Sequence, residues 1–219
     1  FLRRMTMKKK GFTLIELMIV IAIIAIIAAI AIPGILSAIR ASNERNASAS
    51  LKQIANAEGQ FKQTSGGAYY WVGDVRSLYY GTSGGASGTA SKLIADQPLA
   101  NADEKSTIAP GPISGSDWNA DGTMDWTMTA GFPSAAVPKS GHYYGVLDIN
   151  DAGVAYRTVG DQGNMNPNIY GFYARPANYS SGGRFIFQIN EDGQIIQKDA
   201  GESLPTGSYT QNFRDGGTG

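Results

Sequence analysis

The sequence contains no cysteine and a single histidine among its 219 residues. Disulfides, thiolate metal ligands and thiol nucleophiles are therefore excluded. His142 alone leaves one candidate for a histidine-based triad and none for a multi-histidine zinc site. Charge is also scarce: charged residues make up 16% of the chain, and 18 Lys and Arg balance 18 Asp and Glu. A net charge of zero argues against broad electrostatic binding of nucleic acid, which needs a basic patch or stripe.

Glycine and proline are too few for a collagen-like or low-complexity chain, with 28 Gly and 9 Pro. The length suits one large domain or two small ones. Nineteen of the 22 Phe, Trp and Tyr residues follow position 66, so the C-terminal part is able to build a hydrophobic core.

The N-terminus is basic and is followed by a long apolar run. Residues 1–11 hold five Lys and Arg and no acid, and residues 12–32 are apolar except for Thr13 and Glu16. As a helix this run would span roughly 31 Å, the hydrocarbon thickness of a bilayer. The basic flank predicts a cytoplasmic N-terminus and export of the rest.

Two simpler interpretations fit less well. A secretory signal peptide has a shorter apolar region and a small-residue cleavage site, whereas Pro33 and Gly34 follow the run here. A plain membrane anchor fits the length but leaves Glu16 unexplained. A carboxylate within a spanning segment is a functional hypothesis by default.

Residues 8–17, Lys-Lys-Lys-Gly-Phe-Thr-Leu-Ile-Glu-Leu, and the apolar run with Pro33 resemble the processing site and N-terminal helix of type IV pilins and related pseudopilins. The resemblance covers about residues 8–60. It implies that a prepilin peptidase cuts between Gly11 and Phe12 and that the new Phe12 amine is N-methylated. It also implies that the Glu16 carboxylate pairs with the N-terminal amine of a neighbouring subunit during assembly.

This resemblance divides the chain into four parts. We expect a leader peptide at 1–11, a transmembrane and fibre-core helix at 12–33, an amphipathic helix half at 34–65 and a globular β-rich head at 66–219. Met5 or Met7 would give a more ordinary leader than Phe1. Pro33 is expected to kink or locally melt the helix and, in pilin-like fibres, to permit its extension; a simple kink at the membrane exit is the alternative.

An amphipathic stripe continues the helix beyond the membrane segment. Ala47, Leu51, Ile54 and Phe61 fall at helical spacing, and the helix is expected to end near residues 64–67, where Thr-Ser-Gly-Gly stands.

Strand patterns dominate the last third. Residues 142–149 and 154–159 flank one predicted turn, 169–174 form a third strand, and 184–189 and 194–197 flank the turn Asn-Glu-Asp-Gly. The patterns therefore predict an α+β fold class, with the helix packed on an antiparallel sheet, and the resemblance implies that this is a pilin fold. Residues 170–193 are also weakly similar to the terminal strands of pilin-like heads.

One loop has the ligand order of a calcium site. Asp117, Asn119, Asp121, Thr123 and Asp125 match an EF-hand loop in its first nine positions, with Gly at the sixth, although the bidentate Glu at the twelfth is missing. Calcium binding is one interpretation; a surface turn held by side chain to backbone hydrogen bonds is the other.

The remaining candidates have structural interpretations. The acidic cluster at 148–151 suits hairpin turn chemistry, and His142 is interpreted as a structural or surface residue. The aromatic residues at 69–71 and 79–80 suit core or head-to-head packing, with an adhesive surface patch as the alternative.

The resemblance implies a structural, non-enzymatic subunit of a type IV pilus. Such a subunit waits in the inner membrane and is assembled by an inner-membrane platform into an extracellular, homo-oligomeric helical filament. The alternatives are a pseudopilin of a type II secretion system and a minor or tip pilin that binds a surface. The long head and the lack of an Asp-Pro-Trp-Gly-type stretch count against the major pseudopilin.

Overall fold

The computed structural model describes residues 11–64, 70–71, 75, 77–83, 93–103, 126–128, 136–147 and 165–201. By compactness the chain forms two units, Phe1–Ile39 and Arg40–Gly219. The second unit is called the head below.

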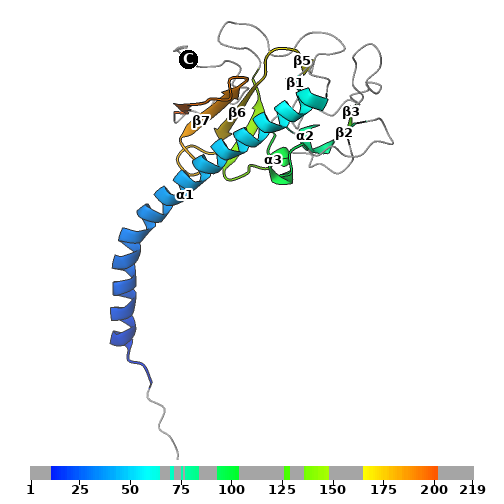
Figure 1. The fold of residues 1–219 in the computed structure, drawn as a ribbon. Helices are drawn as coiled ribbons and strands as arrows, with labels where there is room; N and C mark the ends of the chain where they lie inside the picture. Colours follow the sequence, from blue (N-terminus) through cyan, green and yellow to red (C-terminus); the bar gives the residue numbers. More distant parts are fainter. Residues whose placement is uncertain are drawn as a thin grey trace, which may run out of the picture. The chain divides into compact units, whose positions relative to one another are not determined.

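Helix α1 spans Leu14–Thr64, a length of 51 residues (Figure 1). Its described part ends at Thr64, within the range 64–67 predicted for the helix stop, and residues 65–67 lie outside the described residues. Pro33 lies inside the helix, which continues on both sides of it. Local melting at Pro33, one of the two expectations, is therefore not found in the isolated chain.

The head carries two short helices and eight strands among its described residues. Figure 1 shows most of them. They are β1 (Tyr70–Trp71), α2 (Ser77–Tyr80), β2 (Gly81–Ser83), α3 (Gln97–Asn101), β3 (Trp126–Met128), β4 (His142–Val146), β5 (Met165–Asn166), β6 (Gly171–Pro176), β7 (Phe185–Asn190) and β8 (Ile195–Asp199).

Four of these strands form the main sheet, in the order β4-β6-β7-β8, with every neighbouring pair antiparallel. The pairs β1-β5 and β2-β3 form separate two-stranded sheets. The predicted hairpin around Asn-Glu-Asp-Gly is confirmed as β7-β8, and Gly193 in its turn has a φ of 69°. That left-handed backbone explains the glycine.

Strand β4 differs from the sequence expectation. Its described part ends at Val146 instead of residue 149, and it pairs with β6. The predicted partner strand at 154–159 and its turn lie outside the described residues. The third predicted strand, 169–174, is β6 and is shifted to Gly171–Pro176.

The core lies between α1 and the sheet. Ala47, Leu51, Ile54 and Phe61, the stripe predicted from the spacing, are all fully buried. They share one hydrophobic cluster with alternate residues of the sheet, among them Tyr144, Val146, Phe172, Ala174, Phe187 and Ile189. The α+β architecture, a long N-terminal helix with an antiparallel four-stranded sheet, is therefore as expected.

The other face of the sheet has a smaller cluster. Leu147 and Tyr173 are buried there, with Ile169 against them. Tyr173 pairs across the strands with Gly145, and a Cβ built on Gly145 would lie 2.5 Å from the Tyr173 hydroxyl oxygen. The glycine thus makes room for the aromatic ring.

Candidate functional site

The first turn of α1 is closed by a pair of side chains, Thr13 and Glu16. Thr13 immediately precedes the helix, and its carbonyl accepts a hydrogen bond from Leu17 N at 3.4 Å. Its Oγ1 accepts from Glu16 N at 3.3 Å, while its own N and Oγ1 both donate to Glu16 Oε2 at 2.8 Å. This reciprocal arrangement is a capping box, which satisfies backbone N–H groups that the first helical turn leaves without partners.

The capping box uses only part of the Glu16 carboxylate. Both bonds from Thr13 end on Oε2, and neither uses Oε1. The negative charge also lies in the first turn, where the helix dipole favours it. Because Thr13 and Glu16 both follow the predicted cut, removal of residues 1–11 leaves these hydrogen bonds in place.

The predicted cleavage junction lies just outside the helix. Residues 11–13 are not helical, and Phe12 is 91% exposed. A Cβ built on Gly11 would meet no atom within 4 Å. The Gly11–Phe12 bond is therefore in irregular backbone, open to another protein.

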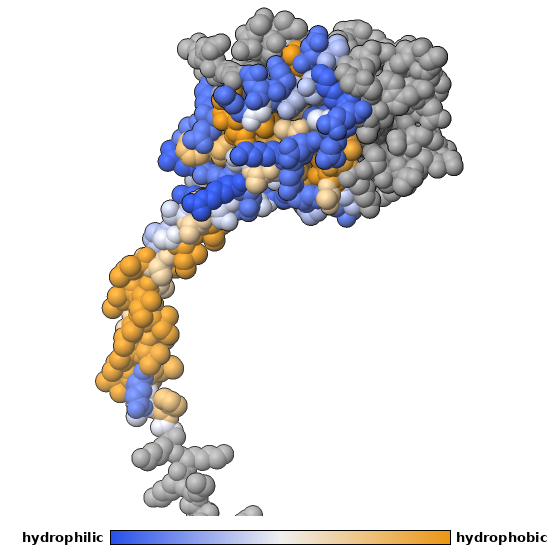
Figure 2. Space-filling view, in the orientation of Figure 1, coloured by the Kyte–Doolittle hydropathy of each residue, from blue (hydrophilic) through white to orange (hydrophobic). Residues whose placement is uncertain are grey.

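The N-terminal half of α1 exposes apolar side chains. The large hydrophobic residues between Leu14 and Ile39 are exposed (Figure 2), and Glu16 is the one ionisable residue of that stretch. By length and composition, α1 is the one helix among the described residues that could cross a membrane, and none of its most apolar window is buried. This apolar surface, directly after the predicted cleavage junction, fits a membrane-anchored precursor.

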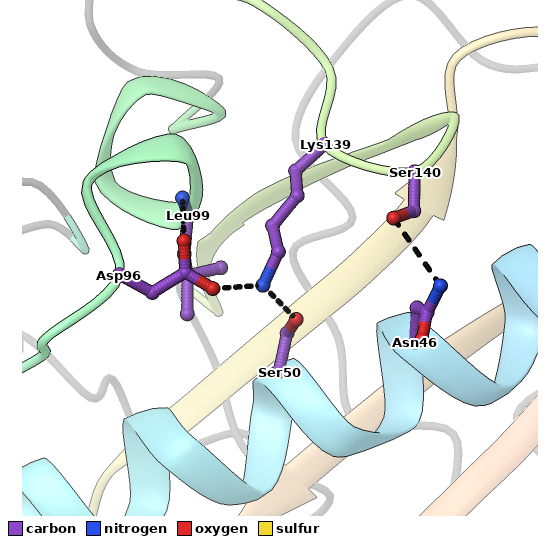
Figure 3. Close-up of polar contacts among 6 residues, drawn as sticks. All are labelled: Asn46, Ser50, Asp96, Leu99, Lys139 and Ser140. Atoms are coloured by element: carbon purple, nitrogen blue, oxygen red, sulfur yellow. Dashed lines mark hydrogen bonds and ion pairs between the residues drawn. The ribbon is translucent and has the colours of Figure 1, made fainter.

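Beyond Arg40, polar contacts connect α1 to the rest of the head (Figure 3). Lys139 forms an ion pair with Asp96, and its Nζ also donates to Ser50 Oγ of α1 at 2.8 Å. Asp96 in turn caps α3, because its Oδ1 accepts from Leu99 N at 3.3 Å. One lysine therefore connects the long helix with the start of the short one.

A second set of hydrogen bonds holds the part of α1 just after Arg40. Asn43 Nδ2 donates to Gly182 O at 3.0 Å, and Glu44 Oε1 accepts from Arg184 N at 2.9 Å. A Cβ built on Gly183 would lie 2.8 Å from the His142 ring, so the segment that contains Gly183 passes close to the start of β4.

His142 is fully buried, which agrees with a structural role for it. Its Nδ1 lies 3.1 Å from Ser140 O, and its ring centroid lies 6.2 Å from that of Phe187. Burial lowers the pKa of His142, while the Ser140 carbonyl and the charge of Glu44 oppose that shift in part. The neutral imidazole is thus the form that the fold accommodates.

The aromatic residue Tyr70 contributes to the core and not to a surface patch. It packs against the hydrophobic cluster, its ring centroid is 4.9 Å from that of Tyr170, and Lys62 Nζ lies 4.0 Å from the Tyr70 ring centroid. The core interpretation is confirmed for this residue.

The proposed calcium ligands, Asp117 to Asp125, lie outside the described residues, as does the cluster at 148–151. Within the part of the chain that is described, no group of three or more His, Cys, Asp or Glu could hold a metal ion. Calcium binding at 117–125 stays a prediction.

Two features of these sites were missed from the sequence although a signal was present. Thr13 and Glu16 follow the S/T-x-x-E pattern of a capping box, and Thr13 was treated only as an interruption of the apolar run. Asp96, before Gln97 and Pro98, has the form of a helix N-cap followed by proline in the first turn. Lys139 gave no local signal because its partners come from distant segments.

Comparison with known proteins identifies the N-terminal segment. Residues 6–32 match the family model described as the prokaryotic N-terminal methylation motif. The match includes the Gly11–Phe12 junction, the capping box and the whole apolar run at 12–32. No curated protein and no solved structure showed significant similarity to the chain.

Proposed function

We propose that this chain, whose methylation motif is the signature of type IV pilins and pseudopilins, is a structural subunit of a type IV pilus. The observation that carries the proposal is one continuous helix with two environments. Its first half exposes apolar side chains directly after the motif, and its second half completes the core of a folded head.

The exposed half of α1 must be kept out of water before and after assembly. Each Leu, Ile or Val side chain there contributes about 1.5–3 kcal/mol when it is fully removed from water. A bilayer removes them before assembly, and a bundle of the same helices removes them in a fibre. The subunit is therefore expected in the inner membrane first and in an extracellular filament afterwards.

Glu16 provides the register between subunits. A carboxylate in an apolar environment is costly unless it is paired with a cation, and the Phe12 amine of a neighbouring subunit supplies one after cleavage. The capping box holds Oε2 in place while Oε1 stays available to that amine. One paired charge in an otherwise apolar bundle has one position of lowest energy, which fixes how far each helix is displaced from the next.

The role requires partners but no catalysis by this chain. A prepilin peptidase makes the cut and methylates Phe12, and a membrane platform lifts each subunit into the filament. Other copies of the chain are the principal partners.

The experiment compares Glu16→Gln with Thr13→Ala in the chain's own host. Gln preserves the capping box pattern but removes the charge, whereas Ala removes the capping hydroxyl but retains the charge. We expect both variants to be cut before Phe12 and methylated, as measured by intact mass. Glu16→Gln should lose sheared fibres, and Thr13→Ala should keep most of them.

Three results would contradict this proposal. An uncut chain in a competent host would exclude pilin processing. A processed chain confined to the membrane fraction would favour a pseudopilin or a minor subunit. Fibres from Glu16→Gln at the wild-type amount would show that the charge does not guide assembly.

We also propose calcium binding by the 117–125 loop. The support is its oxygen ligand order in a chain without disulfides to hold a long loop. Thermal unfolding of the head in calcium and in chelator tests it: a higher Tm in calcium is expected, and equal values would refute it.

A further inference from the structure

A groove of about 540 Å³ lies on the head between α1 and the β7-β8 hairpin. On the helix side it is lined by small residues, Ala41, Ser48 and Ala49. Phe185 and Phe187 line the strand side, the first half-buried and the second 5% exposed. A concave surface with a small-residue side and an aromatic side is suited to a protruding group from another protein.

The rim of this groove is predominantly cationic. Arg45 and Lys52 both line it and are exposed, and their spacing of seven residues places them on one side of α1. The Glu44 carboxylate also lines the groove and its Oε1 accepts a hydrogen bond from Arg184 N, so two cationic side chains stand against one carboxylate. The groove therefore favours an anionic occupant.

The head has an exposed acidic protrusion at the other end of the same strand. Glu191 and Asp192 form the tip of the β7-β8 turn, which is closed by a hydrogen bond from Gly193 N to Asn190 O at 2.9 Å. Glu191 follows Phe185 by six positions along the extended strand, a distance of roughly 20 Å. The turn is thus too far away to fill the groove of its own molecule.

The two surfaces lie at opposite ends of β7. The groove adjoins residues 41–52, where α1 enters the head, while the acidic turn lies toward the end of α1, where Tyr170 contacts Tyr70. Burial raises the pKa of Tyr170, and the nearby charges of Glu191 and Asp192 add to that shift. A contact between two different, complementary surfaces can repeat from copy to copy, and it builds an open helical filament when the rotation between copies does not close into a ring.

We propose that the groove receives the Glu191–Asp192 turn of a second copy of this chain. Arg45 and Lys52 pair with the two carboxylates, and the turn backbone lies between the small helix residues and Phe185. The inference rests on the proposed function, because it supplies a head-to-head contact that accompanies the packing of the apolar helices.

Charge reversal tests the pairing. The first variant combines Arg45→Glu with Lys52→Glu, the second combines Glu191→Lys with Asp192→Lys, and the third carries all four changes. We expect each of the first two to give about tenfold less sheared fibre, because like charges then face each other across the contact. The third should recover most of the yield.

Disulfide trapping provides a second measurement that does not depend on yield. Because the chain has no cysteine, Arg45→Cys combined with Glu191→Cys introduces the only thiols. Oxidised fibres should give a ladder of dimers, trimers and longer species, and either single variant should stay monomeric. The matched control combines Arg45→Cys with Asn168→Cys, an exposed residue toward the same end as the acidic turn, and should give no ladder.

The outcomes separate this inference from the proposed function. If the wild type forms no fibres, the proposed function fails. If fibres form but the cysteine pair gives no ladder, the groove contact is refuted while the pilus subunit stands. Normal fibres from both charge reversals, or no recovery in the fourfold variant of a head that still folds, would also refute it and indicate another occupant.

Discussion

Gly145→Ala should destabilise the head by steric overlap across two strands. The new Cβ would lie 2.5 Å from the Tyr173 hydroxyl oxygen, 2.6 Å from Cζ and 2.8 Å from Cε1. All three distances are shorter than a normal contact, and the atoms belong to a ring that is fully buried and cannot swing into solvent. Overpacking of this kind typically costs about 1–3 kcal/mol.

The magnitude can be measured as a melting temperature. For a head of this size, each kcal/mol shifts Tm by roughly 2–4 °C, so Gly145→Ala should lower Tm by about 2–12 °C. The assay is thermal unfolding of a fragment that begins at Arg40, the start of the second compact unit.

Gly59→Ala is the matched control. It makes the same chemical change inside α1, where a Cβ would meet no atom within 4 Å. Alanine in a helix interior is favoured over glycine by about 0.5–1 kcal/mol, so this variant should unfold at a higher temperature than the wild type.

Tyr173→Ala identifies the source of the cost. In that background the ring is absent, and Gly145→Ala should become much less destabilising. A Tm for Gly145→Ala equal to or above that of the wild type would refute the packing argument, as would an unchanged cost when the ring is removed.

Three further predictions concern the head. Burial lowers the pKa of His142, so as pH falls the unfolded chain binds the proton before the folded head does. The stability of the head should therefore be constant above about pH 6.5 and decrease below it. His142→Gln should weaken this pH dependence of Tm, measured by thermal unfolding between about pH 7.5 and 5. Asp96→Ala should cost about 1 kcal/mol more than Asp96→Asn in urea unfolding, because Asn still caps α3 although both changes remove the charge next to Lys139. Phe61→Ala should cost about 3–5 kcal/mol in the same assay, whereas the exposed neighbour Gln63→Ala should change stability by less than about 0.5 kcal/mol.

Features with local signals were predictable from the sequence. Ala47, Leu51, Ile54 and Phe61 repeat at helical spacing, and all four are buried on one face. The Asn190–Gly193 turn joins two strands because its chemistry suits a tight hairpin, independently of the rest of the fold. The N-terminal motif was equally local, and the family match covers the same residues.

Long-range features were not predictable in the same way. The pairing of β4 with β6 joins residues about 30 positions apart, and nothing within either strand specifies the partner. Lys139 reaches Asp96 and Ser50, which are 43 and 89 residues away, so only the folded chain reveals that ion pair. The capping box differs from these long-range features, because Thr13 and Glu16 form a local sequence pattern from which it could have been predicted.

The placement of α1 in the head has a consequence for the order of folding. The buried helix stripe from Ala47 to Phe61 is synthesised well before its partners Phe172, Phe187 and Ile189, which lie more than 100 residues later. Contacts of such sequence separation form slowly, because a long loop must close before they add stability. Until β7 is available, the stripe is exposed on a helix already attached to the apolar segment. We therefore expect folding to be limited by the arrival of the last strands, and truncation before residue 185 to leave an aggregation-prone chain instead of a smaller folded head.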